Sequence, residues 1–167
     1  VEVVPIGVIP MYGRSADNLR DHRHVTSLLH RIQTTEYGVE VKPVLSFDER
    51  GHQKNNTTYF VYGSAENGEK PESFYPTVEA FIGEGGTFLN PEAVRTNKPG
   101  KTAGTKIQGK EAVGGLRFSR KTLKPKEAAG YILLSGTTKT SDSIALLTSG
   151  CRTKLQVQKM LEEVKEH

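Results

Sequence analysis

The sequence has no tryptophan, a single cysteine, and no apolar run near the roughly 20 residues that a membrane-spanning helix requires. The lone cysteine, Cys151, excludes an internal disulfide framework and a zinc ribbon, which both need several cysteines. The first residues, VEVVP, lack the basic start and the long apolar stretch of a secretory signal. We therefore expect a cytoplasmic protein that has no membrane partner.

The chain also lacks a strong excess of charge of either sign. Its 23 lysines and arginines stand against 19 aspartates and glutamates, which gives a formal net charge of +4. Proteins dedicated to nucleic acids usually concentrate a larger basic excess on one face or in a tail. We expect no nucleic-acid partner.

The chain is long enough for one compact domain. Of its 167 residues, 35% are apolar and 25% are charged, a balance that is polar for a globular protein but too apolar and too patterned for a disordered one. A helical pattern continues to the last residue, so we expect this sequence to be a piece of a longer protein.

The first 136 residues carry the signature of β-strands, with β-branched and aromatic residues separated by turn formers. Residues 24–33 also match helical spacing, but their strand-like neighbours favour a strand. Residues 74–94 predict a packed loop with little regular structure, and residues 96–110, rich in lysine and glycine, predict a mobile surface loop. Strands are expected at 1–10, 24–33, 38–47, 57–62, 113–118 and 130–134, with a hairpin between 38–47 and 57–62 whose loop covers 48–56.

After Gly136 the hydrophobic period becomes helical. Ser141 is expected to cap a short helix that ends at Leu147, and a second helix begins near Thr153 with an apolar stripe at Val157, Met160, Leu161 and Val164. The sequence therefore predicts a mainly β fold: an antiparallel β-sandwich domain at 1–136, followed by a helical linker at 137–167 that leads toward a catalytic domain outside this chain.

No segment carries a convincing catalytic or metal-binding motif. His22, His24 and His30 form a cluster, but the arginine at position 23 disfavours a cation, so surface or interface histidines are favoured. The carboxylates Glu79 and Glu84 lack the apolar surroundings that would raise a pKa for general-acid work. We expect this chain alone to have no catalytic residue, no metal site and no cofactor, and its aromatic residues to fill the core.

One polar turn has the equipment to bind a ligand. Arg14, Asp17, Arg20 and Arg23 combine bidentate donors with acceptors, which suits sugar hydroxyls or a phosphate. A salt-bridge network that pins the turn explains the same residues, and both interpretations stay open.

Four short segments between residues 79 and 127 resemble a known family pattern. The segment EAFIG at 79–83 is followed by NPEAV at 90–94, then by a Gly-rich apolar stretch at 109–116 and an L-x-P-x-E turn that begins at Leu123. In this order and spacing they resemble the N-terminal β-sandwich of family 94 glycoside hydrolases, the cellobiose and β-1,2-oligoglucan phosphorylases.

That resemblance implies a specific role. The family's sandwich is of the galactose-mutarotase-like supersandwich type and is usually longer than the 167 residues of this chain, so we expect an incomplete sandwich that lacks N-terminal strands. In the family, the catalytic acid lies in a following (α/α)6 barrel. The reaction is phosphorolysis of a β-glucoside with inversion, in which inorganic phosphate is the co-substrate. The resemblance also implies a homodimer in which sandwich loops reach the neighbouring active site, and Arg20, backed by Arg14, Asp17 and Arg23, is the candidate sugar contact.

Three alternatives remain from the sequence. The chain is also compatible with a free-standing carbohydrate-binding module, or with part of a cyclic β-1,2-glucan synthase-like glycosyltransferase. The chain is also compatible with a purely structural domain, which would explain why the sequence shows no clear catalytic or binding motif.

Overall fold

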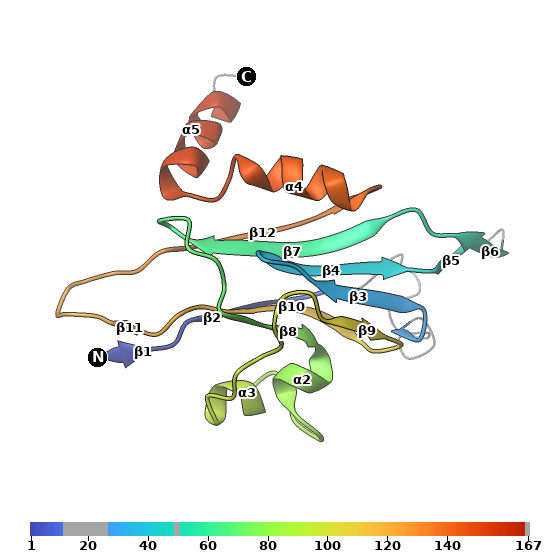
Figure 1. Cartoon of the computed structure of the whole chain (residues 1–167), viewed down its shortest axis with the longest axis horizontal. Helices are drawn as coiled ribbons and strands as arrows, with labels where there is room; N and C mark the ends of the chain where they lie inside the picture. The colour runs from blue at the N-terminus through green and yellow to red at the C-terminus, as the bar shows by residue number, and fades with distance from the viewer. Residues whose placement is uncertain (12–26, 49–50, 166–167) are drawn as a thin grey trace.

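The computed structural model describes residues 1–11, 27–48 and 51–165. Within this part, two antiparallel β-sheets face each other, and a layer of helices covers the outer side of each (Figure 1). The chain is therefore a mainly β sandwich, as the sequence predicts. Three hydrophobic clusters lie between the four layers, one between each pair of neighbouring layers.

The larger sheet has five strands and the smaller one has three, with every neighbouring pair antiparallel. In spatial order the larger sheet contains β12 (Tyr131–Thr138), β7 (Thr58–Ala65), β4 (Gly38–Pro43), β3 (His30–Thr34) and β9 (Lys106–Gln108). The smaller sheet contains β2 (Ile6–Pro10), β10 (Ala112–Arg117) and β8 (Ser73–Thr77). Two short ribbons pair β1 (Glu2–Val3) with β11 (Lys121–Thr122) and β5 (Leu45–Asp48) with β6 (Gly51–Lys54).

The central core lies between the two sheets, where β7 and β10 cross at very close range. A Cβ atom on Gly114 would lie 2.2 Å from the Cβ of Val61, so only glycine fits there. Strand β10 is buried along its whole length because the five-stranded sheet covers one face and α2 the other. The inner cluster comprises Met11, Ile32, Val39, Val41, Val61, Phe74, Ala112, Leu116 and Phe118.

Two short helices, α2 (Val78–Ile82) and α3 (Glu92–Arg95), cover the outer face of the smaller sheet. Helix α2 begins because the side chain of Thr77 accepts a hydrogen bond from the backbone N–H of Ala80, a standard N-cap. Val78 and Phe81 then pack on Tyr75 and Val113 of the sheet.

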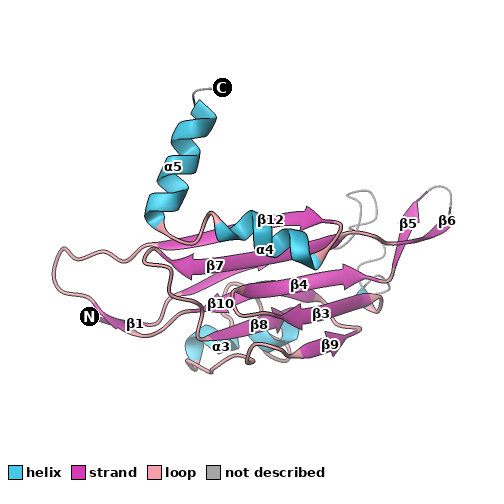
Figure 2. Cartoon of the chain, turned by 45° about the horizontal axis from the view of Figure 1, so that its top comes forward, coloured by secondary structure: helices cyan, strands magenta, loops and turns pink. Residues whose placement is uncertain are grey.

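The outer face of the larger sheet is covered by α4 (Ser141–Ser149), whose Ile144 is fully buried against Phe60 and Tyr62. The N-cap is Thr140, one residue before the residue that the sequence suggested, and its hydroxyl accepts from the N–H of Ser143. Helix α5 (Lys154–Lys165) follows and projects away from the sandwich (Figure 2).

Three sequence predictions of local structure need correction. Residues 74–94 contain strand β8 and both short helices, rather than little regular structure. Residues 96–110 contain β9, and Lys101 pairs with Phe74 of β8, so this stretch is tied to both sheets. Within 48–56, residues 51–54 form strand β6, which pairs with β5. The predicted hairpin itself is confirmed, since β4 pairs with β7.

Candidate functional site

The turn that the sequence singled out lies outside the described residues. Arg14, Asp17, Arg20 and Arg23, and with them His22 and His24, belong to the stretch 12–26. Their role as sugar contacts therefore stays a prediction. Of the predicted histidine cluster the structure describes His30, which is buried on β3 and lies 3.2 Å through Nδ1 from the carbonyl oxygen of Lys110.

A groove of about 510 Å³ runs beside α2 and along β8, an edge strand of the smaller sheet. Its volume falls within the range of roughly 300–1,000 Å³ that is typical of small-molecule sites. A second hollow of about 420 Å³ adjoins it and shares Thr77, Glu79, Gly83, Glu84 and Lys110. The larger groove is also lined by Tyr75, Ala80, Glu92, Lys98, Pro99, Gly100, Lys101 and Ile107.

The wall at 97–101 is fixed by side chains from β8 and β10. The hydroxyl of Tyr75 donates to the carbonyl of Lys98, and the backbone N–H of Gly100 donates to Ser73 Oγ at 3.0 Å. Arg117, 8% exposed, donates to Asn97 Oδ1 at 3.1 Å. Side chains from these two strands therefore hold the wall at 97–101 in one shape.

Gly100 is required in this wall. A Cβ atom there would lie 2.3 Å from the carbonyl oxygen of Phe74, because Lys101 and Phe74 exchange two backbone hydrogen bonds of 2.6 and 2.9 Å. This close pairing sets the groove wall directly against the edge of the smaller sheet.

Charged side chains of both signs line the groove. Lys110 and Glu79 form an ion pair of 2.7 Å, and Lys98 lies 3.6 Å from Glu92. The hydrogen bond from Lys110 and its positive charge lower the pKa of Glu79 below its ordinary value. Glu79 is thus ionised at neutral pH, which is the opposite of what a general acid needs.

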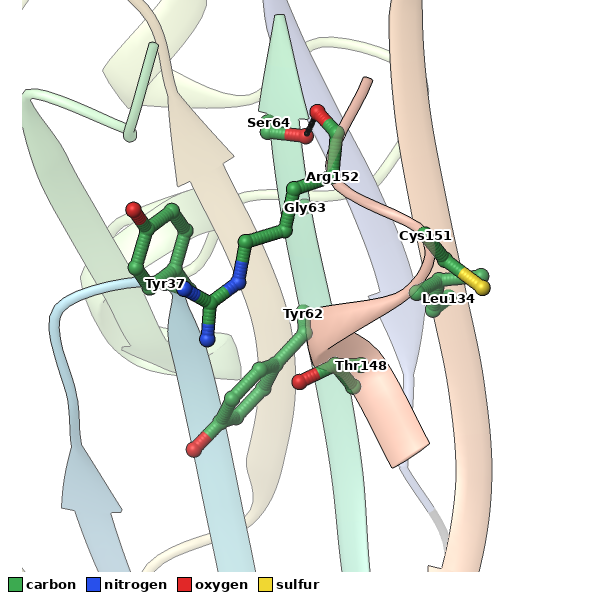
Figure 3. A pocket seen from close by; sticks show the side chains of 8 residues that line it. All are labelled: Tyr37, Tyr62, Gly63, Ser64, Leu134, Thr148, Cys151 and Arg152. Atoms are coloured by element: carbon green, nitrogen blue, oxygen red, sulfur yellow. Dashed lines mark hydrogen bonds between the residues drawn. The ribbon is translucent and has the colours of Figure 1, made fainter. Parts of the chain in front are cut away.

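A third, much smaller pocket lies where α4 meets α5 (Figure 3). Its volume is about 10 Å³, room for about one water molecule. The guanidinium of Arg152 lies over the ring of Tyr37, 4.2 Å from the ring centre, and Ser64 Oγ donates to the carbonyl of Arg152 at 2.7 Å. The pocket is a packed junction between helix and sheet rather than a ligand site.

A buried carboxylate strengthens the same junction. Glu40, 8% exposed, accepts hydrogen bonds from Tyr62 at 2.5 Å and from Ser141 of α4 at 2.9 Å. Burial and the bond to Glu40 raise the pKa of Tyr62 well above its ordinary value, so Tyr62 remains a donor at neutral pH.

Helix α5 is anchored at its start and exposed along most of its length. Thr153 and Gln156 form a reciprocal capping box, with backbone-to-side-chain bonds of 3.3 and 3.0 Å, and the N–H of Lys154 donates to the carbonyl of Glu66 at 2.9 Å. None of its residues is buried, and Leu161 and Val164 of the predicted apolar stripe are 51% and 67% exposed.

Neither a metal-binding cluster nor a membrane-spanning helix is found within residues 1–11, 27–48 and 51–165. No group of three histidine, cysteine, aspartate or glutamate side chains gathers there as a metal site would require. Among the helices of the same residues, none has both the length and the apolar character for a membrane span.

The four-layer arrangement defines an antiparallel β-sandwich module with an anchored helical exit. The family model "Glycosyl hydrolase 94, supersandwich domain" matches residues 17–165, most of the chain. The chain therefore belongs to the glycosyl hydrolase 94 family and forms its supersandwich domain. A comparison with curated proteins gives no match.

Proposed function

We infer that the chain is the non-catalytic, sugar-binding and dimer-forming sandwich of an inverting glycoside phosphorylase that cleaves β-glucosides with inorganic phosphate. Membership of the glycosyl hydrolase 94 family supports this proposal. In such a reaction an acid protonates the leaving oxygen while phosphate attacks the anomeric carbon from the opposite side. We assign that acid to an (α/α)6 barrel that follows the sandwich, and the location to the cytoplasm.

The anchored start and the exposed apolar stripe of α5 support the proposed docking to the barrel. Its start is closed by the capping box between Thr153 and Gln156, and the backbone N–H of Lys154 fixes it to the turn after β7 by donating to the carbonyl of Glu66. Its exposed apolar stripe gains stability only when another surface covers it, at about 25 cal/mol for each Å² of apolar area buried. A fixed start and a free apolar face suit a linker that positions a second domain.

The polar turn is the proposed sugar contact in the active site of the neighbouring subunit. Arg20, supported by Arg14, Asp17 and Arg23, carries the donors and acceptors that vicinal hydroxyls require. In this proposal the sandwich contributes to catalysis in the dimer by holding substrate. It performs no proton transfer itself.

The release of glucose 1-phosphate tests the reaction. The present chain and a longer protein that contains the barrel are each incubated with β-1,2- or β-1,4-linked glucooligosaccharides, with and without phosphate. We expect phosphate-dependent release from the longer protein and none from the chain. Release of free glucose without phosphate from the longer protein would contradict the phosphorylase assignment.

A further inference from the structure

We propose that the groove beside α2 is a binding site for a neutral oligosaccharide, separate from the polar turn at 14–23. The proposal rests on the proposed function only for the kind of sugar, a β-linked glucan. The groove itself is argued from its shape, its charges and its rigidity.

The arrangement of charges favours a neutral ligand over an anion. Lys98, Lys101 and Lys110 face the larger groove together with three carboxylates, Glu79, Glu84 and Glu92. The carboxylates cancel the attraction that the three ammonium groups would exert on a phosphate. A sugar hydroxyl, in contrast, donates to a carboxylate and accepts from an ammonium at the same time.

Two of these charged side chains are available for a ligand. Within the described residues, Lys101 and Glu84 form no ion pair, while Lys98 and Lys110 are each matched with a carboxylate. A charged group that no protein partner holds loses less on binding a hydroxyl, because no ion pair is broken first. Lys101 and Glu84 are therefore the residues whose loss should weaken binding most.

The groove also offers apolar surface for the C–H faces of sugar rings. Ile107, Ala80 and Pro99 contribute this surface, and Tyr75 lines the groove with them. Saccharide sites combine such apolar contacts with a few placed polar groups. Because Tyr75, Ser73 and Arg117 fix the 97–101 wall, binding costs little conformational entropy.

The test measures binding of β-1,2- and β-1,4-linked glucooligosaccharides to the chain by calorimetry and by amide chemical shifts in NMR spectra. We expect saturable binding, with shifts concentrated at the amides of residues 83–84, 98, 100–101 and 109–110. The double variant Lys101→Ala/Glu84→Ala should weaken the affinity at least tenfold. Its matched control, Lys139→Ala/Glu162→Ala, removes two exposed charges outside the groove and should leave the affinity unchanged.

Several outcomes would overturn the groove proposal. They are an absence of binding to every glucan, full affinity in the Lys101/Glu84 variant, or tighter binding of inorganic phosphate or an acidic peptide at the same amides. Each of these leaves the phosphorolysis assay of the longer protein unaffected. Failure of that assay, with groove binding intact, would instead reject the phosphorylase assignment alone.

Discussion

The guanidinium of Arg152 lies 4.2 Å from the centre of the Tyr37 ring and so joins the start of α5 to the turn between β3 and β4. The two residues are far apart in sequence, and the backbone carbonyl of Arg152 is held independently by Ser64. Side chain and main chain of one residue thus tie the helical exit to two places on the five-stranded sheet.

This contact predicts a measurable coupling between the two residues. Arg152→Ala and Tyr37→Leu should each destabilise the chain, and a double-mutant cycle should give a coupling free energy of about 0.5–1 kcal/mol. Urea denaturation followed by circular dichroism measures all four proteins. A coupling of zero would mean that the ring and the guanidinium contribute independently, and the junction would then rest on Ser64 and the buried core.

The close approach of the two sheets at Gly114 predicts a loss of unfolding free energy that exceeds the coupling between Arg152 and Tyr37. Gly114→Ala places a methyl group on the side chain of Val61 and should cost about 1–3 kcal/mol of unfolding free energy. In a Val61→Ala background the same change should cost less, because the overlapping atoms are gone. Gly150→Ala is the matched control: nothing lies within 4 Å of its Cβ, so the change should stay within about 0.5 kcal/mol.

Several of the strands could be predicted because their signal is local. Alternating Val39 and Val41 face the core, and the aromatic run at 57–62 forms β7 as expected. The apolar stripe of α5 was equally visible in the sequence. That the sandwich would leave this stripe exposed was not.

The ordered groove could not be predicted, because the contacts that create it are distant in sequence. The segment 97–101 looks like a mobile loop until Arg117, Ser73 and Tyr75 are seen to hold its backbone. Strand β8 was missed since Pro76 breaks the local pattern, and an edge strand tolerates a proline that a central strand would not.

The hydrogen bond from Tyr62 to Glu40 predicts a loss of stability at alkaline pH. Burial raises the pKa of Tyr62 above the ordinary value of 10.0, so the folded chain holds this proton more tightly than the unfolded chain. Its contribution is complete below pH 10 and is lost as the pH rises further. Urea denaturation between pH 8 and pH 11 should show a falling free energy of unfolding above about pH 10.

The variant Tyr62→Phe distinguishes the contribution of Tyr62 to this pH dependence from that of the other tyrosines. Tyr62→Phe should cost about 1 kcal/mol near pH 7, where the bond to Glu40 is lost, and should reduce the decline above pH 10. Tyr59, Tyr75 and Tyr131, whose pKa values burial also raises, account for the decline that remains. An unchanged slope in Tyr62→Phe would show that Tyr62 does not set this pH dependence.

Substitutions in the exposed apolar stripe of α5 should affect docking to the barrel but not the stability of the chain itself. Leu161→Lys and Val164→Lys change exposed side chains, so together they should alter the unfolding free energy of the chain by no more than about 0.5 kcal/mol. Ile144→Ala on α4 is the contrast: its side chain is fully buried, and its loss should cost about 2–5 kcal/mol. In a longer protein that contains the barrel, the Leu161/Val164 variant should lower the thermal midpoint and the phosphorolysis rate together. A longer protein that keeps both values would mean that the stripe faces solvent there too, and docking would then have to use another surface of the sandwich.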